Sequence, residues 1–210
     1  MKIILTADLS IKKELNEIAI ERKIKVEEKI ALEIKNLNFD QNIHQPYIRA
    51  ANKIIFQSKN AVRHSSILHD CILKNITAKL YGLGRFTGNE LQKYFSNKIV
   101  FPKDNYSSEN LMKIIKMENE PNDKYIIIKG EDGRSYLEDE IRKFSNNIRV
   151  VTVYKRIPIK RFLDESSISE NTNNYFIVSS KLALTELIAN LSSYKNDAPL
   201  ILIIPNKRII

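Results

Sequence analysis

The 210-residue sequence has little of the chemistry that marks several common protein classes. It contains one cysteine, Cys71, no tryptophan and only three histidines. A single cysteine cannot form an internal disulfide, which favours a reducing compartment, and we expect the Cys71 thiol to be a passive core residue. His64 and His69 are five positions apart, so they do not share one helical face and give little support for a metal site. We expect no metal and no cofactor.

Long apolar runs are also missing. The longest, residues 125–128 and 200–205, fall far short of the roughly 20 residues that cross a bilayer. Charged residues follow Met1 within a few positions, too early for the apolar region of a signal peptide. We therefore expect a cytoplasmic protein with no membrane partner.

The charge is strongly basic. The sequence has 34 Lys and Arg against 25 Asp and Glu, a formal net charge of +9. Such a chain attracts polyanions, of which nucleic acid and a small polycarboxylate are both candidates. The basic residues are spread over many segments and no base-reading motif accompanies them, so a nucleic-acid-binding domain is the weaker alternative. A dinucleotide site is weaker still, because the glycine fingerprint that begins at Gly82 and Gly84 has Thr87 where its third glycine belongs.

The fold class follows from periodicity. Short apolar runs alternate with longer amphipathic stretches, the pattern of parallel strands joined by crossover helices. The expected strands are residues 2–6, 24–28, 54–57, 78–82, 98–101, 125–129, 150–154, 175–178 and 200–204. The expected helices are residues 11–21, 61–73, 90–95, 108–117, 134–144 and 181–191. The class is α/β.

Nine strands are many for one open sheet in a chain of this length, so two smaller sheets are more plausible. Residues 29–34 and 154–159 are charged and extended, and they border the long middle block. A chain that passes out to a second domain and later returns needs two such segments. We therefore predict two domains, the first of them discontinuous in sequence.

The strand-to-helix junctions carry most of the candidate chemistry. In a parallel sheet these junctions face a common crevice, and helix starts hold carboxylates or phosphates through free N–H groups. The junctions are residues 57–60, 82–87, 106–109, 129–134 and 178–181. Their serine, threonine and glycine residues could equally be ordinary helix caps. Several such sites in one crevice could bind a molecule with many carboxylates.

Six segments resemble a known family in order and spacing. They are residues 54–62 (IIFQSKNAV), 81–87 (YGLGRFT), Pro102 with 108–111 (SENL), 126–137 (IIIKGEDGRSYL), 150–154 (VVTVY) and 175–180 (YFIVSS). Together they resemble the uroporphyrinogen-III synthases, and the resemblance spans nearly the whole chain.

The resemblance implies a fold of two small flavodoxin-like parallel-sheet domains joined by a two-stranded linker, with the active site in the cleft between them. Domain 1 would comprise residues 1–33 and 157–210, and domain 2 residues 37–152. The linker strands would be residues 29–36 and 153–159. The protein would be a monomer.

The resemblance also implies a reaction. The family cyclises hydroxymethylbilane, a linear tetrapyrrole with eight carboxylates, with loss of water and inversion of the last pyrrole ring, and uses no cofactor. Tyr154 matches a cleft tyrosine with a suggested general-acid role, although it could also be a linker residue that packs on the domain edge. The substrate contacts would be Ser58, Lys59, Gly84, Arg85, Thr87, Gly130, Arg134, Ser179, Ser180 and Lys207. A degenerate relative that only binds tetrapyrrole or a partner is the main alternative.

Two segments depart from the family pattern. The family's threonine-arginine-proline junction after the first strand is Thr6-Ala7-Asp8 here, so a basic contact is missing. The late glycine-proline-threonine-threonine turn is represented by residues 204–207, where Lys207 could supply a charge, and the sequence ends at Ile210. We expect a divergent member that is shortened at this end and in which activity could be reduced.

Overall fold

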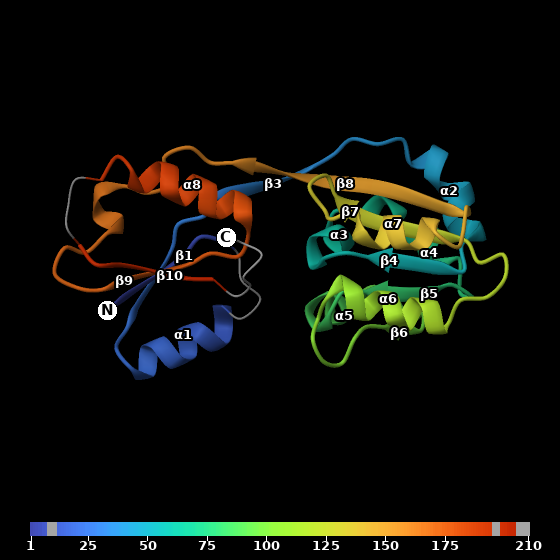
Figure 1. Ribbon diagram of the computed structural model, residues 1–210, viewed down its shortest axis with the longest axis horizontal. Helices are drawn as coiled ribbons and strands as arrows, with labels where there is room; N and C mark the ends of the chain where they lie inside the picture. Colours follow the sequence, from blue (N-terminus) through green and yellow to red (C-terminus); the bar gives the residue numbers. More distant parts are fainter. Residues whose placement is uncertain (8–11, 195–197, 205–210) are drawn as a thin grey trace. The chain divides into compact units, whose positions relative to one another are not determined.

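A computed structural model describes residues 1–7, 12–194 and 198–204 of the chain. The chain divides into two compact units. Unit 1 consists of Met1–Ile34 and Arg156–Ile210, and unit 2 of Lys35–Lys155. Each unit contains a largely parallel sheet with helices, which confirms the α/β class (Figure 1).

Unit 1 is built on a four-stranded parallel sheet in the order β10-β9-β1-β2. Its strands are β1 Lys2–Leu5, β2 Lys25–Glu28, β9 Asn174–Ile177 and β10 Leu200–Ile203, and its helices are α1 Lys12–Glu21, η2 Glu165–Ser167 and α8 Lys181–Leu191. Helices α1 and α8 lie on opposite faces of the sheet (Figure 1). Every residue of β1 is buried, as its continuous apolar sequence predicts for a strand covered on both faces. By contrast, the four side chains of the edge strand β10 are 36–42% exposed.

Unit 2 contains the larger sheet, in the order β3-β8-β7-β4-β5-β6. Its strands are β3 Leu32–Asn36, β4 Lys53–Phe56, β5 Lys79–Gly82, β6 Ile99–Val100, β7 Tyr125–Gly130 and β8 Ile148–Pro158. Its helices are α2 Gln41–Ala50, α3 Lys59–Arg63, η1 Ser66–Leu68, α4 His69–Leu73, α5 Arg85–Leu91, α6 Ser108–Met117 and α7 Tyr136–Arg142. Without the two-residue β6 and without β3, the order β5-β4-β7-β8 matches β2-β1-β9-β10 of unit 1.

Strands β3 and β8 are the two segments through which the chain passes between the units, because both unit boundaries fall inside them. They run in opposite directions. The Leu37 N–H donates to Val153 O at 3.0 Å, and the Ile159 N–H donates to Ala31 O at 2.9 Å.

The core of unit 2 forms because its central strands are apolar throughout. All residues of β4 and β7 are buried. One face of the sheet packs against α6 and α7 through a cluster of buried side chains. These are Ile55, Tyr81, Leu111, Met112, Ile115, Tyr125, Ile127, Leu137 and Ile141. Helices α3 and α5 pack against each other, and α3 also contacts β7.

The helices differ from the sequence prediction in three places. The predicted helix 61–73 is divided into α3, η1 and α4, since the chain turns at His64 and Ser65. Helix α5 begins at Arg85 rather than at residue 90, directly after its N-cap Gly84. Helix α2 was not predicted, because Pro46 lies inside it and interior proline usually breaks a helix.

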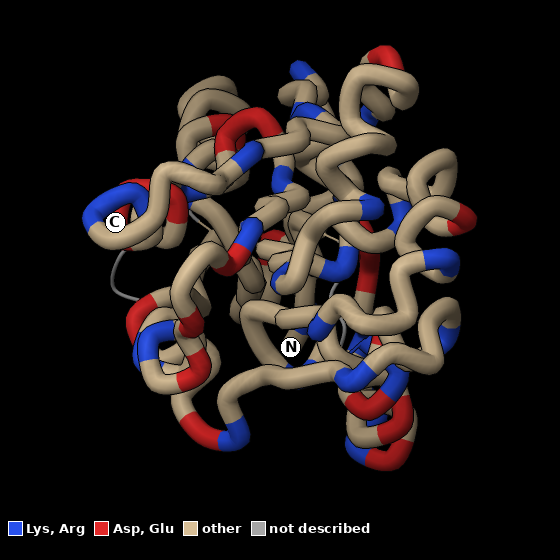
Figure 2. The backbone as a smooth tube through the Cα atoms, turned by 90° about the vertical axis from the view of Figure 1, so that its right-hand side faces the viewer, with Lys and Arg blue, Asp and Glu red and all other residues tan. Residues whose placement is uncertain are grey.

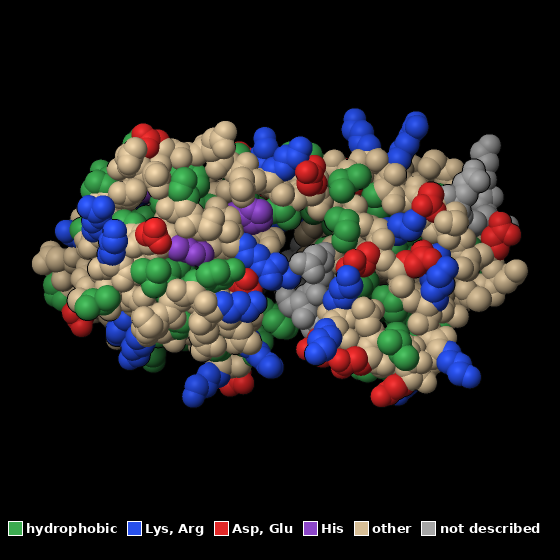
Figure 3. Space-filling view, turned by 180° about the vertical axis from the view of Figure 1, so that it is seen from behind, with side chains coloured by type: hydrophobic (Ala, Val, Ile, Leu, Met, Phe, Trp, Pro, Cys, Tyr) green, Lys and Arg blue, Asp and Glu red, His purple; other side chains and the backbone are tan. Residues whose placement is uncertain are grey.

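The described residues include no helix long and apolar enough to cross a membrane. Lys and Arg are spread along the backbone with Asp and Glu between them on the side seen in Figure 2. Apolar side chains form small groups among polar ones on the face drawn in Figure 3. Neither view shows a single basic stripe.

Candidate active site at the end of the unit 2 sheet

The centre of the unit 2 sheet has the geometry of a ligand site. Strands β4 and β7 are parallel neighbours, and their following helices, α3 and α7, lie on opposite faces of the sheet. At such a switch point the two chains diverge beyond the carboxyl ends of the strands and leave a crevice. The residues that follow β4 and β7 are therefore the first candidates for chemistry.

Tyr154 and Ser58 meet at this point. Tyr154 lies in β8 and is 2% exposed, and its hydroxyl oxygen is 3.0 Å from Ser58 Oγ, with either group able to donate. Ser58 lies just beyond β4 and is half-buried. Its Oγ also accepts a hydrogen bond of 3.0 Å from the Ala61 N–H and so caps α3. The serine is both a helix cap and the partner of a buried phenol.

Gly130 makes room for the tyrosine ring. It pairs with Tyr154 across β7 and β8 at a register shift between Lys129 and Gly130. A Cβ atom at position 130 would lie 2.5 Å from Tyr154 Cζ and 2.9 Å from its hydroxyl oxygen. Any side chain there would displace the ring. The sequence resemblance offered Gly130 as a backbone contact, and in the structure its lack of a side chain leaves the space that the Tyr154 ring occupies.

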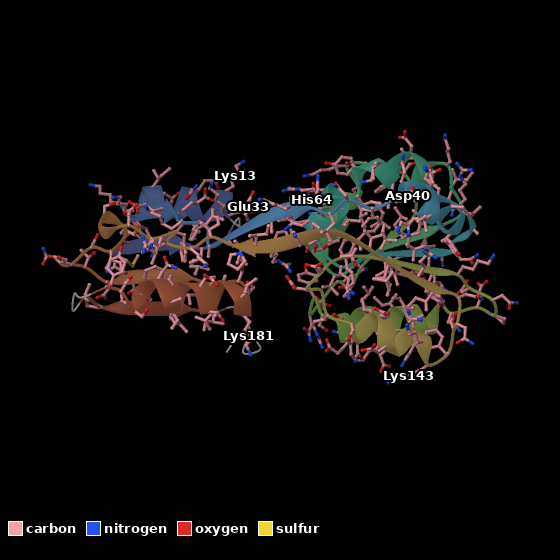
Figure 4. All side chains as sticks on the ribbon, turned by 90° about the horizontal axis from the view of Figure 1, so that it is seen from above. Lys13, Glu33, Asp40, His64, Lys143 and Lys181 are labelled. Atoms are coloured by element: carbon pink, nitrogen blue, oxygen red, sulfur yellow. The ribbon has the colours of Figure 1, made fainter. Side chains whose placement is uncertain are left out.

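His64, which is labelled in Figure 4, borders the same tyrosine. The two ring centroids are 5.5 Å apart, and His64 Nδ1 contacts Asn36 Oδ1. Burial lowers the pKa of His64, and the charge of Arg63 lowers it further. The imidazole is therefore neutral near pH 7. The sequence gives no reason to link His64 with Tyr154, because only the fold places the two rings side by side.

A second group of residues follows β7. The Gln57 amide donates to Arg134 O at 3.1 Å, and a Cβ at Gly133 would lie 2.9 Å from Gln57 Oε1. Arg134 forms an ion pair of 3.1 Å with Glu109 and lies over the ring of Tyr136. Its charge is already shared with a carboxylate, which weakens it as an anion ligand.

Lys129 belongs to the predicted junction 129–134 but was not among the predicted substrate contacts. It is 8% exposed and lies near the end of β7, on the face that Tyr125 and Ile127 share. In the part of the chain that the structure describes, no carboxylate forms an ion pair with it. Its apolar stem is buried while its Nζ atom still reaches solvent, so the ammonium is available to an anion. The sequence signal that could have singled it out is a lysine near the end of the long apolar run of β7.

The junction after β5 is partly buried. Gly84 caps α5, and a Cβ there would lie 2.8 Å from Tyr106 Cβ. Arg85 is exposed, whereas Thr87 is buried inside α5 rather than in an open turn. Lys59, the first residue of α3, is half-buried. These residues remain candidates, with Arg85 and Lys59 the more accessible.

The remaining predicted residues belong to unit 1 or lie outside the described residues. Ser180 caps α8 by accepting a hydrogen bond of 3.2 Å from the Ala183 N–H, and Ser179 is exposed beside it. Thr6 is fully buried and its hydroxyl donates to Ile177 O at 3.0 Å. Lys207 lies outside the described residues. The structure thus brings together Ser58, Gly130 and Tyr154 within unit 2.

One large cavity lies away from these residues. It has a volume of about 900 Å³ and belongs to unit 1. Its lining is Lys160, Arg161, Leu163, Asp164, Glu170, Glu186, Ala189, Asn190, Ser193 and Tyr194. None of the predicted site residues is among them. We place the chemistry at the switch point, because convergent hydroxyl and cationic groups decide reactivity and volume alone does not.

Among the described residues, no group of three His, Cys, Asp or Glu side chains is arranged to hold a metal ion.

Comparison with known proteins identifies the family. A family model described as uroporphyrinogen-III synthase HemD matches residues 15–204. A uroporphyrinogen-III synthetase structure from Helicobacter pylori is similar, with 16% identity, a TM-score of 0.60 and coverage of 99% of this chain and 85% of that one. A mutant uroporphyrinogen III synthase from the extremely thermophilic bacterium Thermus thermophilus has 10% identity, a TM-score of 0.58 and coverage of 90% and 77%.

No curated protein sequence matches this chain closely enough to count as a recognisable relative. The structural likenesses, at these identities, establish the fold, and the family model covers far more than half of the sequence. The chain therefore belongs to the uroporphyrinogen-III synthase family, whose members are lyases of haem biosynthesis.

Proposed function

We propose that this chain converts hydroxymethylbilane into uroporphyrinogen III, and that the Ser58–Tyr154 pair delivers the proton to the leaving hydroxyl. The observation that carries the proposal is the 3.0 Å contact between the two hydroxyl oxygens at the switch point of unit 2. The reaction loses water and inverts the terminal pyrrole ring before closure. It requires a proton donor and a means of holding many carboxylates.

The exposure of the two residues sets the order of proton transfer. Tyr154 is almost fully buried, so a substrate oxygen reaches Ser58 more readily. As the carbon–oxygen bond breaks, the Ser58 O–H donates its proton to the leaving oxygen and water departs. The Tyr154 O–H then restores the proton on Ser58. Ring closure releases a proton from carbon, and this proton returns to the tyrosine, so the pair ends the cycle unchanged.

Substrate carboxylates require cations near this pair. Lys129 is the strongest candidate, because its stem is buried at the end of β7 and a bound carboxylate would compensate its charge. Lys59 and Arg85 follow β4 and β5 at the same end of the sheet. Arg134 is a weaker candidate, since Glu109 already accepts from its guanidinium.

A coupled assay tests the proposal. Freshly generated hydroxymethylbilane is supplied, and the type I and type III uroporphyrin isomers are separated after oxidation. Type III product should depend on the protein. Tyr154→Phe and Ser58→Ala should each lower the rate of type III formation by about 10²–10⁴, the usual contribution of a general acid. The double variant should be no worse than the poorer single variant, because both residues serve one relay.

Ser107→Ala is the matched control for Ser58→Ala. Ser107 caps α6 by accepting from the Asn110 N–H at 3.2 Å, as Ser58 caps α3. The control loses a cap without loss of the relay and should retain type III synthesis. If Ser107→Ala and Ser58→Ala are equally impaired, the relay is rejected. If folded wild-type protein yields only the spontaneous type I isomer, the catalytic proposal fails and a binding-only relative is supported.

A further inference from the structure

A second hollow lies at the opposite end of the unit 2 sheet. It has a volume of about 410 Å³ and lies between α2 and the amino-terminal ends of β7 and β8. Its lining is Pro46, Tyr47, Ala50, Lys124, Tyr125, Ile126, Asn146, Asn147, Ile148 and Arg149. Figure 1 shows α2 at the end of the unit away from α3, which Ser58 caps. The hollow is therefore separate from the candidate active site.

The lining is basic and partly apolar. Lys124 and Arg149 are its charged residues, and it includes neither Asp nor Glu. Asn146 and Asn147 add amide donors, while Ile126 and Ile148 add apolar surface. The volume lies within the range of small-molecule sites. This composition suits an anion that also carries an apolar body.

Arg149 is held in place before any ligand arrives. Its guanidinium lies 4.0 Å from the Tyr47 ring centroid, and its Nε donates to His44 Nδ1 at 3.2 Å. Burial lowers the pKa of His44, as does the charge of Arg149, against an opposing effect of Asp40. The imidazole is therefore neutral near pH 7, and its Nδ1 can accept. Only one of the five guanidinium N–H groups is used in this bond.

A fixed guanidinium with free terminal N–H groups recognises a carboxylate through two parallel hydrogen bonds. The apolar lining and the tyrosine ring favour a flat hydrophobic body beside that group. We propose that this hollow binds a small aromatic carboxylate, with the carboxylate on Arg149 and the ring against Tyr47, Pro46 and Ile126. The site is independent of the cyclisation chemistry.

Benzoate is the probe. Titration into ¹⁵N-labelled protein should move the backbone amide signals of Tyr47, Ala50 and residues 124–126 and 146–149, because these line the hollow. Acetate lacks the ring and benzyl alcohol lacks the charge, so each should bind at least about tenfold more weakly than benzoate. Arg149→Leu should weaken benzoate binding by about tenfold or more. Arg149→Lys should weaken benzoate binding less, since lysine keeps the positive charge and loses only the paired N–H donors of the guanidinium.

Arg49→Leu is the matched control. Arg49 lies on α2 outside the lining and donates to Gln45 at 3.3 Å. It should leave benzoate binding unchanged, and Arg149→Leu should leave type III uroporphyrinogen synthesis unchanged. If Arg149→Leu does not fold, Tyr47→Leu at a half-exposed position provides the test with the same expected loss. Benzoate that moves no signal in the hollow, or an equal loss in Arg49→Leu, overturns the proposal.

Discussion

The central strands of the two units begin with the same residues and lead to different chemistry. Strand β1 reads KIIL and β4 reads KIIF, and every residue of both is buried. Each is flanked in its sheet by a parallel neighbour on either side, in the same order. The two sheets therefore place equivalent junctions after these two strands, and the residues just beyond the strands differ.

The first residues after the two strands make different contacts. In unit 1 the buried Thr6 hydroxyl donates to Ile177 O at 3.0 Å, so it ties β1 to the end of β9. In unit 2 the equivalent region holds Ser58, which is half-buried and paired with Tyr154. In both units the sheet determines where the junction lies, while the residues just past the strand determine which contacts it can make.

The units also differ in how fully their sheets are covered. Strands β4 and β7 of unit 2 are buried throughout, whereas the side chains of β10 in unit 1 are 36–42% exposed. Less apolar burial means a lower free energy of local unfolding. We expect unit 1 to open first.

Lys2 and Lys53 are the first residues of β1 and β4, and their replacement gives the largest expected difference in unfolding free energy between the units. Lys53 pairs with Asp123 inside unit 2, and both side chains are under 10% exposed. Lys53→Met leaves that carboxylate buried without its cation and should cost about 3–5 kcal/mol of unfolding free energy. Lys2→Met should cost only about 1–2 kcal/mol, because Glu27 is partly solvated and keeps Lys25 at 2.7 Å. Urea titrations followed by hydrogen exchange in each unit measure both losses.

If Lys53→Met and Lys2→Met lose the same unfolding free energy, burial of the partner carboxylate does not explain a difference in stability between the units. Lys53→Arg serves as the control that retains the charge in unit 2.

Substitutions at Gly130 and Gly84 test whether β7 positions the ring of Tyr154. Gly130→Ala forces a methyl group to within 2.5 Å of Tyr154 Cζ, so the ring must move from Ser58. Displacement of a catalytic group by about 1 Å costs roughly 100-fold in rate, and we expect at least that loss of type III synthesis. Gly84→Ala meets the partly exposed Tyr106 and should lose less than about tenfold. Full activity of a folded Gly130→Ala protein would contradict the positioning role.

The sequence predicted the central strands β1, β4 and β7 well, because their nearly continuous apolar runs admit few alternatives. Helix 108–117 was predicted to the residue, since Ser107 caps it and its apolar face is regular. Helix α2 was not predicted, because Pro46 argues against a helix there. In the structure the helix forms nonetheless, with Asp40 as its N-cap. Start positions of short helices such as α5 depend on glycine caps that periodicity does not detect.

The candidate site was predictable in parts only. The family resemblance named Ser58, Gly130 and Tyr154 separately, but their meeting depends on strand register. Ser58 and Tyr154 are 96 positions apart, and a register shift in the β7–β8 pairing sets Tyr154 opposite Gly130. No periodicity in the sequence encodes that shift. Lys129 was not named among the substrate contacts for a related reason, because its burial follows from the helices packed over β7.

The smallest expected difference between the units is in how their stability responds to mild acid. All three histidines, His44, His64 and His69, belong to unit 2, and burial is the first cause that lowers each pKa. Because their pKa values are depressed in the folded state, the unfolded chain binds more protons between those values and about 6.5. Their stabilising effect is complete above a pH of about 6.5 and is lost as the pH falls toward the folded values.

Unit 2 should therefore lose stability between about pH 6.5 and 5, while unit 1, which has no histidine, should not. The carboxylates with lowered pKa values, among them Glu90 and Glu27, titrate below this window and do not obscure it. The deeply buried His69 contributes at most about 1.4 kcal/mol per pH unit. Hydrogen exchange in each unit at about pH 6.5 and 5 measures the difference, and His69→Gln should reduce it. The separate cores of the two units suggest that they unfold independently. An equal loss of stability in unit 1 would contradict this and would mean that the two sheets unfold together.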